Sequence, residues 1–354
     1  MDDDDRSVAG HRCVVTVLSV GYAFAPVTAD PPGGSEQILA TLDRALTAAG
    51  HRSIVVAQKG SVTTGELYTT PAPHGRIEEP MWAISHAIMR EQIAAVIERD
   101  RPDVVHLHGL DFGHYLPSTD RPVLVTLHLP LDWYAADWLR PKRPRTFLQP
   151  VSTSQAARAD ADVALIAPVA NGIDTDRYRP GPKRDRALVL GRITVEKGFH
   201  DALDAAHAAA APLDVAGMIF PYAEHEHYFA SQVAPRLDAE RRYVGPVAGE
   251  AKAALLRAAR CVLIASTAAE TSSLVAMEAL ASGTPVIAYR AGALPDIVEH
   301  GVTGWLVDDV AGMAEAIRRV DAIDPAACRA AALARFSQTR MIEDYMQLYR
   351  QLAA

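Results

Sequence analysis

Short apolar runs alternate with amphipathic helical patterns along the whole chain, and this alternation limits the fold more than any other feature. Such a pattern is typical of parallel strands joined by helices. A helix expected to begin near Ser35, for example, has Ile38, Leu42 and Leu46 on one face. The pattern predicts an α/β protein with doubly wound parallel sheets. The expected strands are CVVTVLS, SIVVA, VVHLH, VLVTLH, ALVLG, LDVAGMI, CVLIAS, PVIAY and GWLV.

Residues 177–186, RYRPGPKRDR, are rich in proline and charge and are the best candidate for a linker between two domains. A chain of 354 residues is long for one domain and comfortable for two. We expect domains at 13–176 and 187–336 and a final helix at 337–354. Ligands bind at the carboxyl ends of parallel strands, so both domains should face one central cleft. Residues 1–12, MDDDDRSVAGHR, are expected to be a disordered end or a remnant of cloning.

Composition excludes several classes of protein. A net charge of -8, a pI near 5.9 and 49% hydrophobic residues are ordinary for a soluble globular protein and do not suggest nucleic-acid binding. No apolar run approaches the roughly 18 residues of a membrane span, and the acidic start is unlike a secretory signal. Cys13, Cys261 and Cys328 are odd in number and scattered, which favours buried thiols and a cytoplasmic location. Phosphate-binding loops with G-x-G-x-x-G or G-x-x-x-x-G-K-[ST] are absent from the sequence.

Two cations follow the strand expected at ALVLG. Arg192 and Lys197 come just after Gly191, and a helix is expected to begin near Gly198. Cationic side chains beside a helix N-terminus form an anion site, because the helix dipole and the free N–H groups add to their charge. Taken alone, such a pair is more often a solvated turn.

Two carboxylates, Glu270 and Glu278, stand eight positions apart in AAETSSLVAMEALASG. Paired carboxylates suggest glycoside hydrolysis, in which they face each other about 5 to 9 Å apart. Here residues 274–281 are expected to form a helix, so Glu270 precedes it and Glu278 lies inside it. At roughly 1.5 Å per residue the carboxylates should be of order 10 Å apart, with free backbone N–H groups between them. That layout suits one long anionic ligand held at both ends.

Several motifs together resemble retaining glycosyltransferases of family 4, which have the GT-B fold of two Rossmann-like domains. The resemblance covers nearly the whole chain after Arg12 and also implies that the amphipathic C-terminal helix, MIEDYMQLYRQLAA, packs back across the domains through Met341, Tyr345 and Leu348. The motifs are GRITVEKG, YVGPVAGEAKAALLRAARCVLIAS, ETSSLVAMEALASGTPVIAYRAGALPDIVEHGVTGWLV, PPGGSEQ, DVVHLHG, VTLH and VANGID.

The resemblance implies a role for each matching residue. Arg192 and Lys197 would bind the donor diphosphate, Glu278 the ribose hydroxyls and Glu270 the hydroxyls of the donor sugar, beside which His128 would lie. Glycines would let the first loop approach the diphosphate, and backbone near 243–245 would meet the base. The implied catalytic residues are Glu270, His128, Arg192 and Lys197. The implied donor-binding residues are Gly33, Gly34, Arg192, Lys197, Tyr243, Val244, Gly245, Glu270, Ser272, Ser273, Leu274 and Glu278.

The resemblance also implies a chemistry without a metal or another cofactor. Negative charge develops on the departing diphosphate, and Arg192, Lys197 and a helix N-terminus would stabilise it. The configuration of the sugar would be retained, and the departing phosphate would accept the acceptor's proton on the same face. This chain departs from the family pattern where it has Ser272 and Ser273 in place of Phe-Gly. A serine can cap the helix equally well, but the change affects the local backbone path.

Other motifs have structural interpretations. His106 and His108 alternate on one strand and point to one side, which suits a metal only if a third ligand exists. The D-x-D triplets that begin at Asp160 and Asp174 are expected to be structural. The basic segment Trp138–Phe147 is a solvated loop by default, and its alternative is a contact with an anionic acceptor or a lipid surface.

The sequence therefore predicts a cytoplasmic, retaining hexosyltransferase that uses a nucleotide-diphosphate sugar, UDP in preference to GDP. The acceptor would be a small-molecule or lipid-linked hydroxyl, as in bacterial members that glycosylate small molecules, and neither nucleic acid nor a transmembrane segment is expected. Two alternatives remain: a non-catalytic subunit that binds sugar nucleotides, and a nucleotide-sugar epimerase of similar fold. Acceptor identity and oligomeric state have no signature in the sequence.

Overall fold

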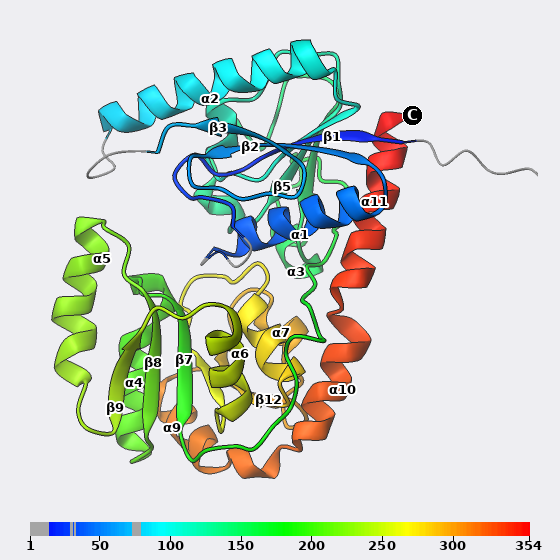
Figure 1. Ribbon diagram of the computed structural model, residues 1–354. Helices are drawn as coiled ribbons and strands as arrows, with labels where there is room; N and C mark the ends of the chain where they lie inside the picture. Colours follow the sequence, from blue (N-terminus) through cyan, green and yellow to red (C-terminus); the bar gives the residue numbers. More distant parts are fainter. Residues whose placement is uncertain (1–13, 29–30, 32, 73–78) are drawn as a thin grey trace, which may run out of the picture.

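The computed structural model describes residues 14–28, 31, 33–72 and 79–354. The expected end at residues 1–12 and Cys13 lie outside the described residues. Within these residues the chain forms two six-stranded sheets in which all strand pairs are parallel. The first sheet uses β1 to β6 and the second uses β7 to β12 (Figure 1). This confirms the predicted α/β class.

The first sheet has the order β3-β2-β1-β4-β5-β6, in which the chain starts at the centre and winds both ways. Leu18 packs in the cluster that contains Met89 of α2, and Val17 packs in the cluster that contains Ile38 of α1. Burial on both faces explains why these strands are continuous apolar runs. The elements are β1 (Thr16–Val20), α1 (Gly34–Ala48), β2 (Arg52–Gln58), β3 (Glu66–Thr70), α2 (Glu79–Asp100), β4 (Val104–Leu107), η1 (Phe112–His114), β5 (Val123–Leu127), η2 (Leu131–Trp133), β6 (Thr146–Pro150) and α3 (Thr153–Ala156).

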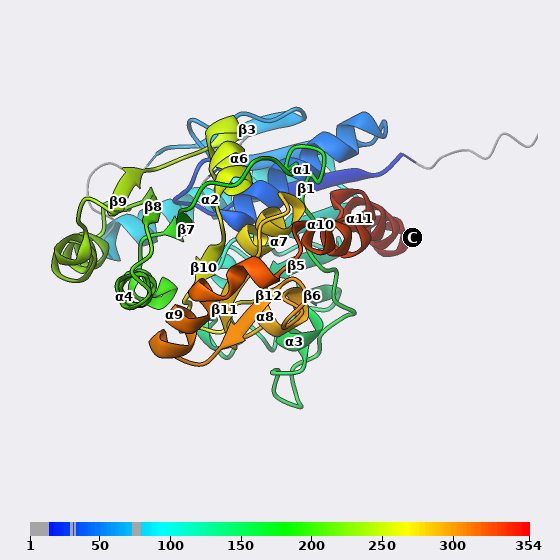
Figure 2. The same cartoon turned by 90° about the horizontal axis from the view of Figure 1, so that it is seen from below.

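The second sheet has the order β12-β11-β10-β7-β8-β9 and the same winding. Viewed from below, α6 and α7 lie on one face of this sheet and α4 and α9 on the other (Figure 2). The elements are β7 (Ala187–Arg192), η3 (Val195–Lys197), α4 (Phe199–Ala208), β8 (Leu213–Met218), α5 (Ala223–Tyr228), η4 (Phe229–Val233), η5 (Ala234–Arg236), β9 (Arg241–Gly245), α6 (Gly249–Ala258), β10 (Val262–Ile264), α7 (Leu274–Ala281), β11 (Val286–Tyr289), α8 (Leu294–Ile297), β12 (Gly304–Val307), α9 (Val310–Arg318), η6 (Val320–Ala322), α10 (Pro325–Arg335) and α11 (Gln338–Ala353).

All nine predicted strands are present, and three strands, β3, β6 and β9, were not predicted. Their sequences, ELYTT, TFLQP and RRYVG, carry polar or charged residues and lack a continuous apolar run. Each lies at the edge of its sheet and pairs with a single neighbouring strand, so its other side is open. Edge strands need less burial, so the apolar signal is weak there.

The C-terminal helix α11 returns to the first domain, running along it as far as the last residues (Figure 1). Met341 and Tyr345 are fully buried, and Leu348 packs against the same core. The hydroxyl of Tyr349 lies 2.8 Å from Nδ1 of His106 in β4. The helix therefore packs back as the resemblance implied.

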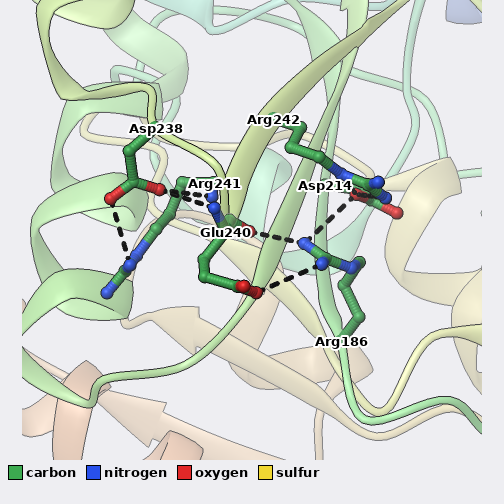
Figure 3. A network of polar contacts seen from close by, with 6 residues as sticks. All are labelled: Arg186, Asp214, Asp238, Glu240, Arg241 and Arg242. Atoms are coloured by element: carbon green, nitrogen blue, oxygen red, sulfur yellow. Dashed lines mark hydrogen bonds and ion pairs between the residues drawn. The ribbon is translucent and has the colours of Figure 1, made fainter.

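A network of ion pairs joins the amino ends of three strands of the second sheet (Figure 3). Asp214 at the start of β8 accepts a 2.9 Å hydrogen bond from Arg242 of β9 and lies 3.5 Å from Arg186, which precedes β7. Arg186 also donates to the backbone carbonyl of Glu240. Because the network lies at the amino ends, it stabilises the sheet at the end away from the cleft.

Candidate active site

Three polar contacts connect loops and helices that follow the carboxyl ends of strands in the two sheets. Oγ1 of Thr271 donates to the carbonyl of His128 at 2.7 Å. Nε2 of Gln37 in α1 donates to Oε1 of Glu278 in α7 at 3.2 Å. Ser154 of α3 donates to Asp296 of α8. Residues from both domains therefore line one interdomain cleft, as predicted.

Glu270 is held by a lysine and a serine. Its Oε1 accepts hydrogen bonds from Nζ of Lys197 and Oγ of Ser266, both at 2.5 Å, and its side chain is 11% exposed. Burial alone would raise the pKa of Glu270, but the adjacent Lys197, the hydrogen bonds and the charge of Arg192 together lower it. Among the described residues, Oε2 of Glu270 has no hydrogen-bond partner. The carboxylate is thus ionised and half available to a ligand.

The backbone of Glu270 is fixed by a glycine. Gly292 has a φ of +58°, and a Cβ there would lie 2.0 Å from the carbonyl oxygen of Glu270. The N–H of Ala293 donates to that carbonyl at 2.6 Å. A cavity of about 230 Å³ lies beside this segment. It is lined by Pro130, Leu131, Asp132, Ser154, Gln155, Arg158, Ala269, Glu270, Thr271 and Gly292.

Arg192 and Lys197 flank the start of α4 as the sequence predicted. Gly198 between η3 and α4 has a φ of +63°, and a Cβ there would lie 2.0 Å from the carbonyl oxygen of Ala265. This close approach brings Lys197 beside the loop that carries Glu270. Within the described residues the guanidinium of Arg192 makes no hydrogen bond or ion pair, although its charge acts on the pKa of both Glu270 and Glu36. Arg192 is therefore a cation available at the cleft.

Glu278 is fully buried in α7, and its two oxygens differ. Oε1 accepts hydrogen bonds from Lys252 at 2.7 Å, Tyr178 at 2.9 Å and Gln37 at 3.2 Å. Oε2 is buried without a partner among the described residues. Buried carboxylate oxygens are normally hydrogen-bonded, so Oε2 of Glu278 has the capacity to accept a further hydrogen bond.

Sequence reasoning missed Lys252, Tyr178 and Gln37. They lie 26, 100 and 241 positions from Glu278, and no local spacing connects them to it. The only signal for Lys252 was weak. Lysine occurs at only five positions in the chain, so a lysine on a helix rich in alanine suggests a specific ionic partner.

The first-loop glycines lie where the domains approach each other. A Cβ on Gly34 would lie 3.5 Å from the side chain of Leu274 in the other domain. A Cβ on Gly33 would lie 1.9 Å from Oε2 of Glu36. Burial raises the pKa of Glu36, while hydrogen bonds from its own backbone and from Ser35, and the charge of Arg192, oppose that rise. Gly33 therefore makes room for the Glu36 carboxylate, and its approach to a diphosphate stays a prediction.

The serines before α7 do not cap the helix through their side chains within the described residues. The helix spans Leu274–Ala281 as expected, with Ser273 at the N-cap, but Ser273 makes no side-chain capping bond. The Oγ of Ser272 is buried without a partner among the described residues, and Thr271 uses its hydroxyl for His128. No capping hydroxyl is therefore directed at the first N–H groups of α7.

His128 follows β5 and is partly buried. Burial lowers its pKa to about 3, so the ring is neutral near pH 7. Its Nε2 lies 3.1 Å from Nδ1 of His108. Residues 243–245 lie at the end of β9, where Tyr243 donates to the carbonyl of Gly217 at 2.9 Å, Val244 is 39% exposed and Gly245 has a φ of +85°.

Comparison with known proteins decides the family. The family description "Glycosyltransferase Family 4" matches residues 32–177, and "Glycosyl transferases group 1" matches residues 184–321. The chain belongs to family 4 of the glycosyltransferases. It is thus a transferase of the GT-B fold that moves a sugar from a nucleotide sugar.

Individual proteins are similar to this transferase over nearly its whole length. It is 29% identical over 387 residues to the glycogen synthase of Mycobacterium tuberculosis, covering 93% of this chain and 91% of that protein. The structure resembles AviGT4, a glycosyltransferase of avilamycin A biosynthesis, with a TM-score of 0.70, 24% identity and coverage of 96% and 98%. It also resembles Anabaena HepE in complex with UDP-glucose, with a TM-score of 0.73, 18% identity and coverage of 95% and 100%.

The remaining motifs of the transferase take part in internal contacts. Arg140 pairs with Asp160 at 3.0 Å and Asp162 at 2.6 Å, and Asp174 accepts from the backbone N–H of Asp176 at 3.0 Å. In the basic segment, Arg143 donates to backbone carbonyls, among them that of Arg121. These contacts support the structural interpretation of the D-x-D triplets.

The described part of the transferase contains neither a candidate metal cluster nor a helix that could cross a membrane. No group of three or more His, Cys, Asp or Glu side chains there could hold a metal ion. In the same residues no helix has both the length and the apolar character that crossing a membrane requires.

Proposed function

We propose that this transferase moves a hexose from a UDP-sugar to a hydroxyl of a small-molecule or lipid-linked acceptor, with retention at the anomeric carbon and without a metal. One observation carries the proposal. Glu270 and Glu278 each have Oε1 bound by a lysine, Lys197 and Lys252, and each leaves Oε2 without a partner among the described residues. Two carboxylates, each with one oxygen that has no hydrogen-bond partner among the described residues, are suited to accept from the hydroxyls of two sugars.

In this proposal Glu278 binds the ribose and Glu270 binds the transferred hexose. The unsatisfied Oε2 of Glu278 would accept from ribose hydroxyls, which removes the cost of a buried unpaired oxygen. The cavity of about 230 Å³ beside Glu270 would receive the hexose. Backbone at 243–245, at the end of an edge strand, would meet the base. A related fold bound to UDP-glucose supports uridine as the nucleoside.

The diphosphate would lie between the two sugars. Arg192, which has no ion pair among the described residues, and the first N–H groups of α7, which no side chain caps, would donate to it, and Gly33 and Gly34 would approach it from the first domain. Lys197 would share its ammonium between Glu270 and the phosphate. Fixed donors directed at developing negative charge are the usual largest contribution to catalysis.

The bond between the anomeric carbon and the β-phosphate oxygen breaks first in the proposed reaction. The leaving phosphate then takes the proton of the acceptor hydroxyl, whose oxygen bonds the anomeric carbon on the same face. The products are a nucleoside diphosphate and a glycoside of unchanged configuration. Glu270 positions the sugar through Oε2 while Lys197 and Ser266 hold its Oε1. In this reaction it is not a nucleophile, because the acceptor oxygen bonds the anomeric carbon directly.

Incubation with a panel of UDP- and GDP-sugars, with and without hydroxyl acceptors, tests the proposal. We expect UDP release with one UDP-hexose and a glycoside whose anomeric configuration matches the donor by NMR. The Lys197→Ala variant should bind UDP but lose turnover by about 100-fold or more, as expected for removing a charge that stabilises the leaving group. Release only from GDP-sugars, an inverted product, or conversion of the sugar without an acceptor would contradict the proposal.

A further inference from the structure

Three histidines, two buried and the third partly exposed, form a stack that leads from the C-terminal helix to the cleft. The ring centroids of His106 and His108 lie 3.9 Å apart, and those of His108 and His128 lie 5.3 Å apart at an interplanar angle of 20°. Nδ1 of His108 is 3.1 Å from Nε2 of His128. The hydrogen-bond partners along this stack determine which nitrogen of each ring carries its proton.

Tyr349 of α11 contacts His106 at the end of the stack farthest from the cleft. The hydroxyl of Tyr349 lies 2.8 Å from Nδ1 of His106, and it has no other partner among the described residues. Tyr349 is 1% exposed, so a hydroxyl hydrogen not donated to Nδ1 would be a buried donor without an acceptor. Burial lowers the pKa of His106, so the ring is neutral. Its single proton therefore lies on Nε2.

The partners of Nε2 of His106 are compatible with a proton on that nitrogen. Nε2 of His106 lies 2.7 Å from Oγ1 of Thr126, whose own hydrogen goes to Oε1 of Gln149 at 2.8 Å. The orientation of the Gln149 amide is set by its Nε2, which donates to the carbonyls of Pro150 and Val169. Each hydrogen in this part of the network has an acceptor.

His108 has one nitrogen without a partner, and this decides its tautomer. Its Nε2 is buried and unpartnered among the described residues. A proton on Nε2 would leave a buried N–H unpaired, which is rarer and costlier than an unused lone pair. A doubly protonated ring would have the same defect, and burial lowers the pKa of His108. The proton therefore lies on Nδ1 and is donated to Nε2 of His128.

We propose that His108 is a positioning residue that holds His128 as the neutral tautomer protonated on Nδ1, so that His128 meets the donor sugar as a hydrogen-bond donor. The inference rests on the proposed function, in which the hexose lies beside Glu270. The His128 ring is partly exposed, its Nδ1 has no partner among the described residues, and its carbonyl accepts from Thr271, the residue after Glu270. Because its one lone pair faces His108, His128 does not act as the base, and the acceptor's proton goes to the leaving phosphate.

The tautomer can be observed without any substrate. In protein labelled with ¹⁵N-histidine, a long-range ¹H–¹⁵N correlation spectrum distinguishes protonated Nδ1 from protonated Nε2. Signals of His128 are assigned by their disappearance in His128→Asn. We expect protonated Nδ1 in both His108 and His128, and protonated Nε2 in His128 would overturn the proposal. This readout does not depend on the proposed function.

Two substitutions of His108 test the effect on turnover. His108→Leu removes the donor, whereas His108→Asn places an amide N–H where Nδ1–H was. We expect His108→Leu to lower kcat about tenfold or more with KM for the donor changed less than about threefold, and His108→Asn to recover most of the loss. An unchanged kcat in a folded His108→Leu, or an equal loss in both variants, would overturn the proposal. If the wild-type protein transferred no sugar, only the proposed function would be refuted. The tautomers of His108 and His128 would still be tested by the NMR spectrum, which needs no substrate.

Discussion

Lys197 and Lys252 pair with carboxylates in the same manner, but the consequences of losing each lysine differ because the carboxylates differ in exposure. The side chain of Glu270 is 11% exposed, whereas that of Glu278 is 0% exposed. Removing one partner of a buried ion pair leaves an uncompensated charge, which is strongly destabilising, while a charge near solvent is screened. Lys252 is therefore expected to stabilise the fold, and Lys197 to act chiefly in the reaction.

Replacing Lys252 with methionine tests this difference. We expect Lys252→Met to lower the free energy of unfolding by about 3 kcal/mol, because Glu278 stays buried without its counter-charge. Urea unfolding followed by circular dichroism measures the change. The double variant Lys252→Met with Glu278→Gln should recover part of the loss, and a single variant as stable as the wild type would contradict the account.

At the scale of elements, most strands could be predicted because burial on both faces makes them continuous apolar runs. The edge strands β3, β6 and β9 could not, since they carry polar residues that an open edge tolerates. The start of α7 was predicted correctly, but the sequence alone did not show whether a side chain caps it. Whether a hydroxyl bends back to its own helix or toward another domain, as that of Thr271 does, depends on contacts distant in sequence.

The junction of η3 with α4 depends on a glycine. Gly198 and Gly60 both have positive φ, +63° and +99°, but only at Gly198 would a Cβ meet a neighbour, the Ala265 carbonyl oxygen at 2.0 Å. We expect Gly198→Ala to lower the free energy of unfolding by about 3 kcal/mol and Gly60→Ala by about 1 kcal/mol, the cost of positive φ alone. Thermal and urea unfolding measure both, and equal losses would refute the close approach.

The ion-pair network at the amino ends of β7, β8 and β9 concerns stability alone (Figure 3). Asp214→Ala leaves Arg186 and Arg242 without their shared carboxylate, and we expect a loss of about 1–2 kcal/mol. Donor affinity should be unchanged, because the cleft lies at the opposite strand ends. A calorimetric titration with UDP checks this, and weakened binding in a folded Asp214→Ala would contradict the separation.

At the scale of the whole molecule, the cleft could be predicted because parallel strands present their carboxyl ends to it. The contacts that hold its carboxylates could not. Gln37 of α1 and Tyr178, which lies between α3 and β7, are 241 and 100 positions away from Glu278 in the sequence. Only the folded chain brings them together. The same holds for Tyr349 of α11, which reaches His106 of β4.

Calorimetric titration of UDP and of the UDP-hexose substrate into Glu278→Gln and Glu270→Gln tests the central claim most directly. If Glu278 binds the ribose and Glu270 the hexose, Glu278→Gln weakens both ligands by about tenfold, the loss of about 1.4 kcal/mol, and Glu270→Gln leaves UDP affinity unchanged while kcat falls strongly. The Asp214→Ala variant serves as the matched control for reduced stability. Wild-type affinity of Glu278→Gln for UDP would contradict the account.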